Sequence, residues 1–403
     1  IWNDLTTVQA IWNLRDTFKS SFRSAVLMTT PEAHAPRELD SDTIVLDDPL
    51  PAEEQIQKVI EAQCKNAGIA APKNEQMTKA IDALKGLSLF VIEQIVALAL
   101  RKTGIDMAEL WTRKIQAVET TPGATVYKGG MSFDDIGGHD GIKRDLLREI
   151  KSKKPVKLVV ILDEFEKMLA GASSDHVGDG GVAKDSAQVV LTNMQDHGHR
   201  GLIAFGHPGT GKTALAKAMA SAADVLCIQA DMGAMKGGVV GESEARIRAF
   251  FGLVNAIAGD GGAFFFATCN STGAITPELR RRFKTGFYFI DLPTRQEKDA
   301  IWRVHMTRFG LKKQTMPDDS VWTGAEIEVC CEKADNYGIS LLEASESIVP
   351  TAIAKPEQIE QRRREAHGAM LSSATGRTFM SPSLMKEDAE EVAPAPSRKI
   401  KLN

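Results

Sequence analysis

The stretch that decides the fold covers residues 201–223 and reads GLIAFGHPGTGKTALAKAMASAA. An apolar strand at 201–205 leads into a glycine-rich loop, and a helix is expected over 214–222. The loop has the pattern G-x-x-x-x-G-K-T between strand and helix, which is the context that a phosphate-binding loop requires. Backbone N–H groups of such a loop and the positive end of the helix converge on phosphate oxygens. The stretch therefore predicts an α/β domain with a parallel sheet that binds a nucleotide.

The chemistry of this loop assigns roles to its residues. Lys212 is expected to reach the β- and γ-phosphates of ATP, and Thr213 is expected to ligate Mg²⁺. The expected nucleotide-binding residues are Pro208, Gly209, Thr210, Gly211, Lys212, Thr213 and Ala214.

A second apolar run, at 158–162, ends in the carboxylates Asp163 and Glu164. Five consecutive apolar residues indicate a buried parallel strand whose end presents both acids. Hydrolysis at a phosphate loop needs an acid for the metal and a base for water. We expect Asp163 to hold Mg²⁺ through its water shell and Glu164 to polarise the attacking water.

Polar residues also follow the strand expected at 263–268. Asn270 stands at the end of that strand, where its amide can bond the attacking water or the γ-phosphate. Arg280, Arg281 and Arg282 follow on a short helix. They form either a solvated face or a group that reaches the γ-phosphate of a neighbouring subunit. We favour the second interpretation, with Arg280 and Arg281 as the fingers and Arg282 as a structural residue.

Together these motifs resemble the classical AAA clade of AAA+ ATPases, especially the katanin/spastin type. FDDIGG at 133–138, GESE at 241–244 and TGAEI at 323–327 carry the resemblance, which spans about 130–350. It implies ATP hydrolysis with Mg²⁺, and it implies further contacts to the adenine base. The expected base-side residues are Asp135, Ile136, Gly137 and Ala325.

The sequence departs from that clade at two places. The acidic strand precedes the phosphate loop, whereas in most AAA+ proteins it follows, and no acidic pair ends the downstream strand at 263–268. Packing rather than chain order sets the place of a strand in a parallel sheet, so Asp163 is expected beside Thr213. The second departure is Val239, which stands where the clade has an aromatic residue in its central-pore loop. Threading of a peptide through a pore is therefore not indicated.

The chain divides into five expected segments. They are a partial, degenerate α/β segment at 1–50, a helical lid-like subdomain at 51–125, the large ATPase domain at 126–292, a helical lid at 293–355 and a polar, partly disordered tail at 356–403. A strand–loop–strand–helix order near the N-terminus repeats that of 264–293. The repeat is either a common arrangement or the remnant of a first ATPase module, as in a subgroup with prokaryotic and phage-encoded members.

Composition limits the remaining possibilities. The 403 residues are 43% hydrophobic and 25% charged, with a net charge of -4, so no overall basic field indicates nucleic acid. The five cysteines form no CxxC pair, which favours a cytoplasmic protein without zinc or disulfides. No apolar run approaches the roughly 18 residues of a membrane span. Because the chain opens at Ile1, residues are expected to precede it.

Three functions are compatible with these features. The preferred one is a homo-oligomeric ring, most simply a hexamer, that uses ATP to remodel an unidentified protein or protein assembly. The first alternative is a DNA-associated motor or loader, for which the runs Arg362-Arg363-Arg364 and Lys399-Ile400-Lys401 are candidate contacts. Such short basic runs are usually only solvated. The second alternative is a slow nucleotide-dependent scaffold.

Overall fold

The computed structural model describes residues 4–21, 39, 50–170, 180–231, 235, 242–273, 275–350 and 356–384. The chain separates into two compact units, Ile1–Pro51 and Ala52–Asn403. Helix α1 (Leu5–Ser20) belongs to the first unit and begins at Asp4, whose side chain accepts a hydrogen bond from the N–H of Thr6. The strands of the repeat expected near the N-terminus lie outside the described residues, so the repeat stays a prediction.

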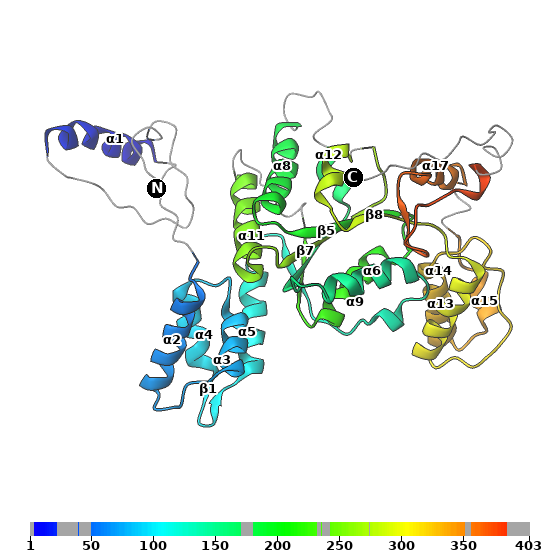
Figure 1. Ribbon diagram of the computed structural model, residues 1–403, viewed down its shortest axis with the longest axis horizontal. Coiled ribbons are helices and arrows are strands. Elements are labelled where there is room, and N and C mark those ends of the chain that lie inside the picture. The colour runs from blue at the N-terminus through cyan, green and yellow to red at the C-terminus, as the bar shows by residue number, and fades with distance from the viewer. Residues whose placement is uncertain are drawn as a thin grey trace, which may run out of the picture. The chain divides into compact units, whose positions relative to one another are not determined.

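The second unit begins with a small helical module (Figure 1). It consists of α2 (Glu53–Asn66), α3 (Glu75–Leu84), α4 (Leu89–Ala99) and α5 (Met107–Glu119), with the short strands β1 (Leu100–Arg101) and β2 (Gly104–Ile105) before α5. Ile56, Ile60 and Cys64 recur at helical spacing and are fully buried in its core. The module is helical as expected, and its likeness to the lid stays a prediction.

A seven-stranded sheet forms the centre of the second unit, in the order β3-β6-β4-β7-β5-β8-β9. Its strands are β3 (Ala124–Tyr127), β4 (Leu158–Leu162), β5 (Arg200–Gly206), β6 (Leu226–Ala230), β7 (Ala263–Cys269), β8 (Gly286–Ile290) and β9 (Leu371–Ser372). Only the edge strand β3 pairs antiparallel, and every other pairing is parallel. This confirms the predicted α/β fold with a mostly parallel sheet.

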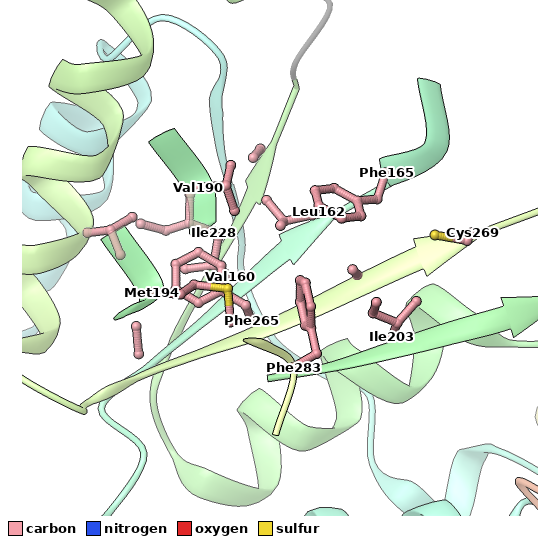
Figure 2. Packing of buried hydrophobic residues seen from close by; sticks show 14 of the residues in the cluster. Val160, Leu162, Phe165, Val190, Met194, Ile203, Ile228, Phe265, Cys269 and Phe283 are labelled. Atoms are coloured by element: carbon pink, nitrogen blue, oxygen red, sulfur yellow. The ribbon is translucent and has the colours of Figure 1, made fainter. Parts of the chain in front are cut away.

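Helices cover both faces of this sheet (Figure 1). One face carries α7 (Phe165–Ala170), α8 (Gly180–Asp196), α11 (Glu242–Ala258) and α12 (Pro277–Arg282), and the other carries α6 (Asp140–Ile150) and α9 (Lys212–Ala223). Alternate residues of β4 point to opposite faces. Val160 and Leu162 therefore pack with Phe165 and Val190 in one core (Figure 2), while Val159 and Ile161 belong to the other core.

The early acidic strand fits this sheet without a change of handedness. The connections β4 to β5, β6 to β7 and β7 to β8 each move two places in one direction and cross the face of α8, α11 and α12. The connection β5 to β6 moves in the opposite direction and crosses the face of α9. Reversing both direction and face preserves the hand, so all four crossovers agree, as the strong rule for parallel sheets requires.

The lid follows β8, and the chain then returns to the sheet. The lid contains α13 (Arg295–Arg308), α14 (Gly324–Tyr337) and α15 (Leu341–Ser345), which share a core around Trp302 and Ile327. Next come α17 (Pro356–Ala366) and β9, which pairs with β8. The segment expected as a polar, partly disordered tail thus contains a helix and a short strand within residues 356–384. The apolar residues of this segment are too sparse in the sequence to predict a strand.

No helix in the described ranges is both long enough and apolar enough to span a bilayer.

Candidate nucleotide site

The phosphate loop connects β5 to α9, as its sequence predicts. Gly209 and Gly211 have φ angles of +77° and +84°, a backbone conformation that strongly favours glycine. A Cβ at Gly206 would collide with the carbonyl oxygen of Ile290 on the neighbouring strand. The glycines of this motif are thus required by the shape of the loop and by its packing against β8.

Lys212 lies under the loop with only 8% of its surface exposed. Its Nζ donates to the carbonyl oxygens of Gly206 (2.9 Å) and His207 (2.7 Å) and to Oδ1 of Asn270 (2.9 Å). Burial, followed by the cation of Arg362, lowers the pKa of Lys212 to about 8. The structure therefore brings the predicted Lys212 and Asn270 together, in a lysine pocket built from uncharged oxygens.

Asp163 lies beside Thr213, although the two residues come from elements in reversed chain order. The hydroxyl of Thr213 donates to Oδ1 of Asp163 at 3.4 Å. Thr268 also donates to Oδ1, and Nε2 of Gln229 donates to Oδ2 at 3.3 Å. Because β4 lies next to β7 in the sheet, the expected position of Asp163 is confirmed.

Glu164 follows in a left-handed backbone conformation, with φ of +49°. Such a conformation is uncommon for a residue other than glycine and often occurs at functional sites. Its N–H donates to Oγ1 of Thr268 at 3.1 Å, and its carboxylate accepts from Nζ of Lys167 at 2.5 Å. This hydrogen bond is the largest cause that raises the pKa of Lys167. The Glu164 side chain is 46% exposed, so water reaches it freely.

Glu166 is a further acidic residue at the site. Its Oε1 accepts from the backbone N–H of Asn270 at 3.1 Å, and its Oε2 is buried without a partner in the described residues. The contact fixes the backbone of Asn270, whose amide faces Lys212.

All the expected base-side residues line one cavity with the phosphate loop. The N–H of Ala325 donates to the carbonyl oxygen of Gly209 at 3.1 Å, which joins the lid to the loop. A Cβ on Gly137 would lie 2.6 Å from the backbone nitrogen of Ile301, so glycine is needed there. The carboxylate of Asp135 accepts from Ser132, whose hydrogen bonds are the main cause that lowers the pKa of Asp135. The cavity has a volume of about 1240 Å³ and includes Asp135, Ile136, Gly137, Asp163, Glu164, Pro208, Gly209, Thr210, Gly211, Lys212, Thr213, Ala214, Asn270 and Ala325.

The arginines of α12 do not line this cavity. The guanidinium of Arg280 lies over the ring of Phe287, 4.8 Å from its centroid, and its Nε is buried. Arg281 is exposed, and within the described residues its side chain forms no hydrogen bond or ion pair. The structure thus distinguishes two residues that sequence reasoning treated alike.

The sequence analysis did not predict several residues of this site. Thr268 and Glu166 stand one or two positions from predicted residues, and alternation along β7 could have indicated Thr268. His139 is buried beside the loop, and its Nδ1 lies 3.1 Å from Oγ of Ser373. Arg362 contacts His207 across 155 residues of chain. Contacts of such sequence separation become visible only in the fold.

Of the remaining predicted features, the central-pore loop around Val239 and Gly241 lies outside the described residues. Glu242 begins α11, so the rest of the GESE stretch is helical.

Comparisons with known proteins place part of the chain near AAA ATPases. Residues 202–259 match the model of the family described as "ATPase family associated with various cellular activities (AAA)". The chain is similar to the uncharacterized AAA domain-containing protein ycf46 of Guillardia theta, with 22% identity over 89% of this chain and 76% of that protein. It is also similar to spastin of Anopheles gambiae (27% identity, 38% of this chain and 20% of spastin) and to the peroxisomal ATPase PEX6 of Yarrowia lipolytica (30% identity, 30% of this chain and 9% of PEX6).

These matches support an AAA+ ATPase. The family match begins in β5 and ends in α11, so it contains the phosphate loop and leaves out the preceding strand with Asp163 and Glu164.

Proposed function

We propose that this chain hydrolyses ATP at the site described above, with Asp163 as the metal-side acid and Glu164 as the base for water. The observation that carries the proposal is the contact between Thr213 and Asp163, two residues whose strands are reversed in the sequence. The sheet assembles the components that phosphoryl transfer needs in spite of the altered chain order.

The residues at the site fit ATP with Mg²⁺. Thr213 and Asp163 offer hydroxyl and carboxylate oxygens, and Mg²⁺ completes such a pair with water and phosphate oxygens. Within the described ranges no group of three or more His, Cys, Asp or Glu side chains gathers to hold a metal. When bound, the nucleotide supplies the phosphoryl group and the metal neutralises its charge.

Each chain residue then has a defined task. Lys212 turns from the carbonyl oxygens of its own loop to phosphate oxygens, which are stronger acceptors because they are charged. Asn270 remains beside Lys212 and orients the attacking water, while Glu164 takes up its proton. Lys167 forms an ion pair with the Glu164 carboxylate and holds it at the edge of the cavity.

The position of the α12 arginines supports a ring. Arg281 is exposed and lies outside the cavity of its own chain, so it is suited to act on the nucleotide of a neighbour. A ring repeats one heterologous contact and supplies every site with such an arginine. We propose a homohexamer with Arg281 as the principal finger and Arg280 beside it.

The most suitable role for such a ring is remodelling of a protein or protein assembly. Its similarity to spastin and PEX6 and the katanin/spastin-like motifs support this role, and a prokaryotic or phage origin and a cytoplasmic location stay predictions. A nucleic-acid motor is less favoured because Arg362 and Arg363, two of its candidate contacts, bind His207 and Asp291 of this chain.

The test compares Lys212→Ala and Glu164→Gln with the wild type. We expect Lys212→Ala to lose ATP binding in calorimetry. Glu164→Gln should bind ATP and release phosphate at least about a hundredfold more slowly, because general-base catalysis contributes that much or more. The exposed acid Glu357, changed to Gln, is a matched control. Wild-type turnover by Glu164→Gln would place the base elsewhere. If the proposal holds, this ATP-trapped variant is also the bait of choice for capturing the substrate.

A further inference from the structure

The chain after the lid forms a strap, residues 356–384, that binds to the large domain at several points. β9 extends the sheet at β8, and the ring of Phe379 packs edge-on against Phe289 with centroids 4.6 Å apart. The N–H groups of Gly141 and Ile142 each donate to strap carbonyl oxygens at 2.9 Å. The strap is therefore a fixed part of the domain that holds the phosphate loop.

One strap residue, Arg362, reaches the two strand ends that enclose the phosphate site. Its Nε donates to the backbone oxygen of Asn270 at 3.2 Å, and its Nη1 contacts Nδ1 of His207. His207 belongs to the phosphate loop, and Asn270 holds Lys212 through its amide oxygen. A single half-buried guanidinium thus connects the loop to the strand end of β7, in a geometry that a rigid fork of donors suits.

The protonation of His207 is consistent with this contact. Burial and then the cations of Arg362, Lys212 and Arg363 lower the pKa of His207 to about 4. The ring is therefore neutral at pH 7, and its Nδ1 can accept a hydrogen bond from Arg362 while Nε2 carries the hydrogen. Nε2 is buried and has no partner within the described residues.

We infer that Arg362 is a positioning residue of the ATPase site, supplied in cis by the strap, which holds His207 and Asn270 in a fixed relation. The inference rests on the proposed hydrolysis. Arg362 does not line the cavity, so it acts through these two residues rather than by touching the nucleotide. Because the backbone amides of the loop bind phosphate without it, the loss of Arg362 affects the chemical step more than binding.

The test compares Arg362→Ala and Arg362→Lys with Arg364→Ala, a control that removes an exposed arginine of the same helix. Phosphate release, the dissociation constant of ADP and the unfolding temperature are measured for each variant. We expect Arg362→Ala to lower kcat about tenfold, or about 1.4 kcal/mol, with the ADP dissociation constant within about twofold of wild type. Arg362→Lys should recover only part of the rate because it loses the fork, and Arg364→Ala should match the wild type.

A second measurement does not depend on hydrolysis. The His207 ring is titrated by NMR in the nucleotide-free chain, with its signal assigned by comparison with His207→Gln. Removing the Arg362 cation should raise the pKa of His207, while Lys212 and Arg363 still lower it. An unchanged pKa, or Arg362→Ala turning over at the wild-type rate, would overturn the inference. So would a kcat loss in both Arg362 variants that follows a fall in unfolding temperature. A wild-type chain that hydrolyses no ATP would instead refute the proposed function and leave the His207 titration as the test of the contact.

Discussion

The chain carries two runs of three arginines, one in α12 and one in α17. The two runs differ in their exposure and in the groups that they contact. In α17, Arg362 contacts the phosphate loop and Arg363 forms an ion pair with Asp291, whose Oδ2 lies 2.9 Å from Nε. In α12, Arg281 is exposed, and it forms no ion pair or hydrogen bond within the described residues. Arg362 and Arg363 of the α17 run thus contact their own chain, whereas Arg281 of the α12 run faces solvent.

The difference shows that the role of a run of like charges depends on the groups that the fold places around it. Both runs sit on short helices, and sequence reasoning assigned the first run to solvent or nucleic acid and the second to a neighbour's nucleotide. The groups that lie near each helix determine which contacts its arginines make. Arg363 and Arg362 in α17 contact Asp291 and the ring of His207, whereas Arg280 in α12 lies over the face of Phe287 on β8.

The largest effect is expected for Arg281→Ala. If this residue reaches the γ-phosphate of a neighbour, its loss should lower kcat by about a thousandfold, the lower range for an arginine supplied in trans. ATP binding should be unchanged, because the residue does not line the cavity of its own chain. Steady-state phosphate release and calorimetric ATP titration measure the two quantities.

The control for Arg281→Ala is Lys284→Ala, which removes an exposed cation three positions along the chain. Mixing Arg281→Ala with Lys212→Ala should restore part of the activity, because some junctions then pair an intact site with an intact arginine. A mixture as inactive as its components, or an unchanged rate in Arg281→Ala alone, would make the two arginine runs equivalent and remove the argument for a shared site.

A smaller effect, on stability, is expected for Arg363→Ala. Both side chains of its pair with Asp291 are about one quarter exposed, so the loss should fall between that of a surface pair and that of a buried pair, at about 2 kcal/mol. Urea unfolding at pH 7 measures it. The loss should be absent in Arg364→Ala, and equal losses in the two variants would show that the ion pair contributes nothing specific.

The pH dependence of this loss follows from Asp291. Burial raises the pKa of Asp291 above its ordinary value, and Arg363 opposes that rise. Without Arg363 the pKa rises further, so the native state binds a proton that the unfolded state releases. Stability then falls as pH rises through the interval between the unfolded and the folded pKa. The deficit of Arg363→Ala should therefore be smaller at pH 4.5 than at pH 7.

Sequence reasoning reached the parts of this molecule that local pattern determines. The phosphate loop, the buried strand before Asp163 and the strand before Asn270 each carry their own signal, and parallel pairing brings their ends together. The place of Asp163 beside Thr213 could be predicted because a sheet orders strands by packing. The difference between Arg280 and Arg281 could not, because the position of Arg280 depends on its contact with Phe287 in the next strand.

The strap marks the clearest limit of prediction. Residues 356–384 read as a charged tail because α17 has only a few apolar positions, such as Ile359 and Ala366, that are buried. Its attachment depends on polar contacts, including those of Arg363 with Asp291 and Ser373 with His139, over long sequence separations. The spacing of apolar residues in the sequence does not predict contacts of that kind. Hydrophobic pattern predicts cores, whereas this segment combines a few buried apolar residues with long-range hydrogen bonds and one short strand.

The smallest predicted effect concerns a proton at Lys212, and it again separates the two arginine runs. Burial and the cation of Arg362 lower the pKa of Lys212 to about 8 in the nucleotide-free chain. Bound phosphate stabilises the charged lysine, so at pH 8 binding should take up about half a proton per site, falling toward zero at pH 6.5. ATP itself contributes little at pH 8, since a terminal phosphate titrates near pH 6. Calorimetry in buffers of different ionisation enthalpy measures the uptake as the slope of the apparent enthalpy.

Arg362→Ala removes one cation, raises the pKa of Lys212 and should reduce the uptake at pH 8. Arg281→Ala and Arg364→Ala should leave it at the wild-type value, because neither cation is among the groups that lower the pKa of Lys212. Equal uptake in all three variants would mean that the α17 run acts on the phosphate site no more than the α12 run does.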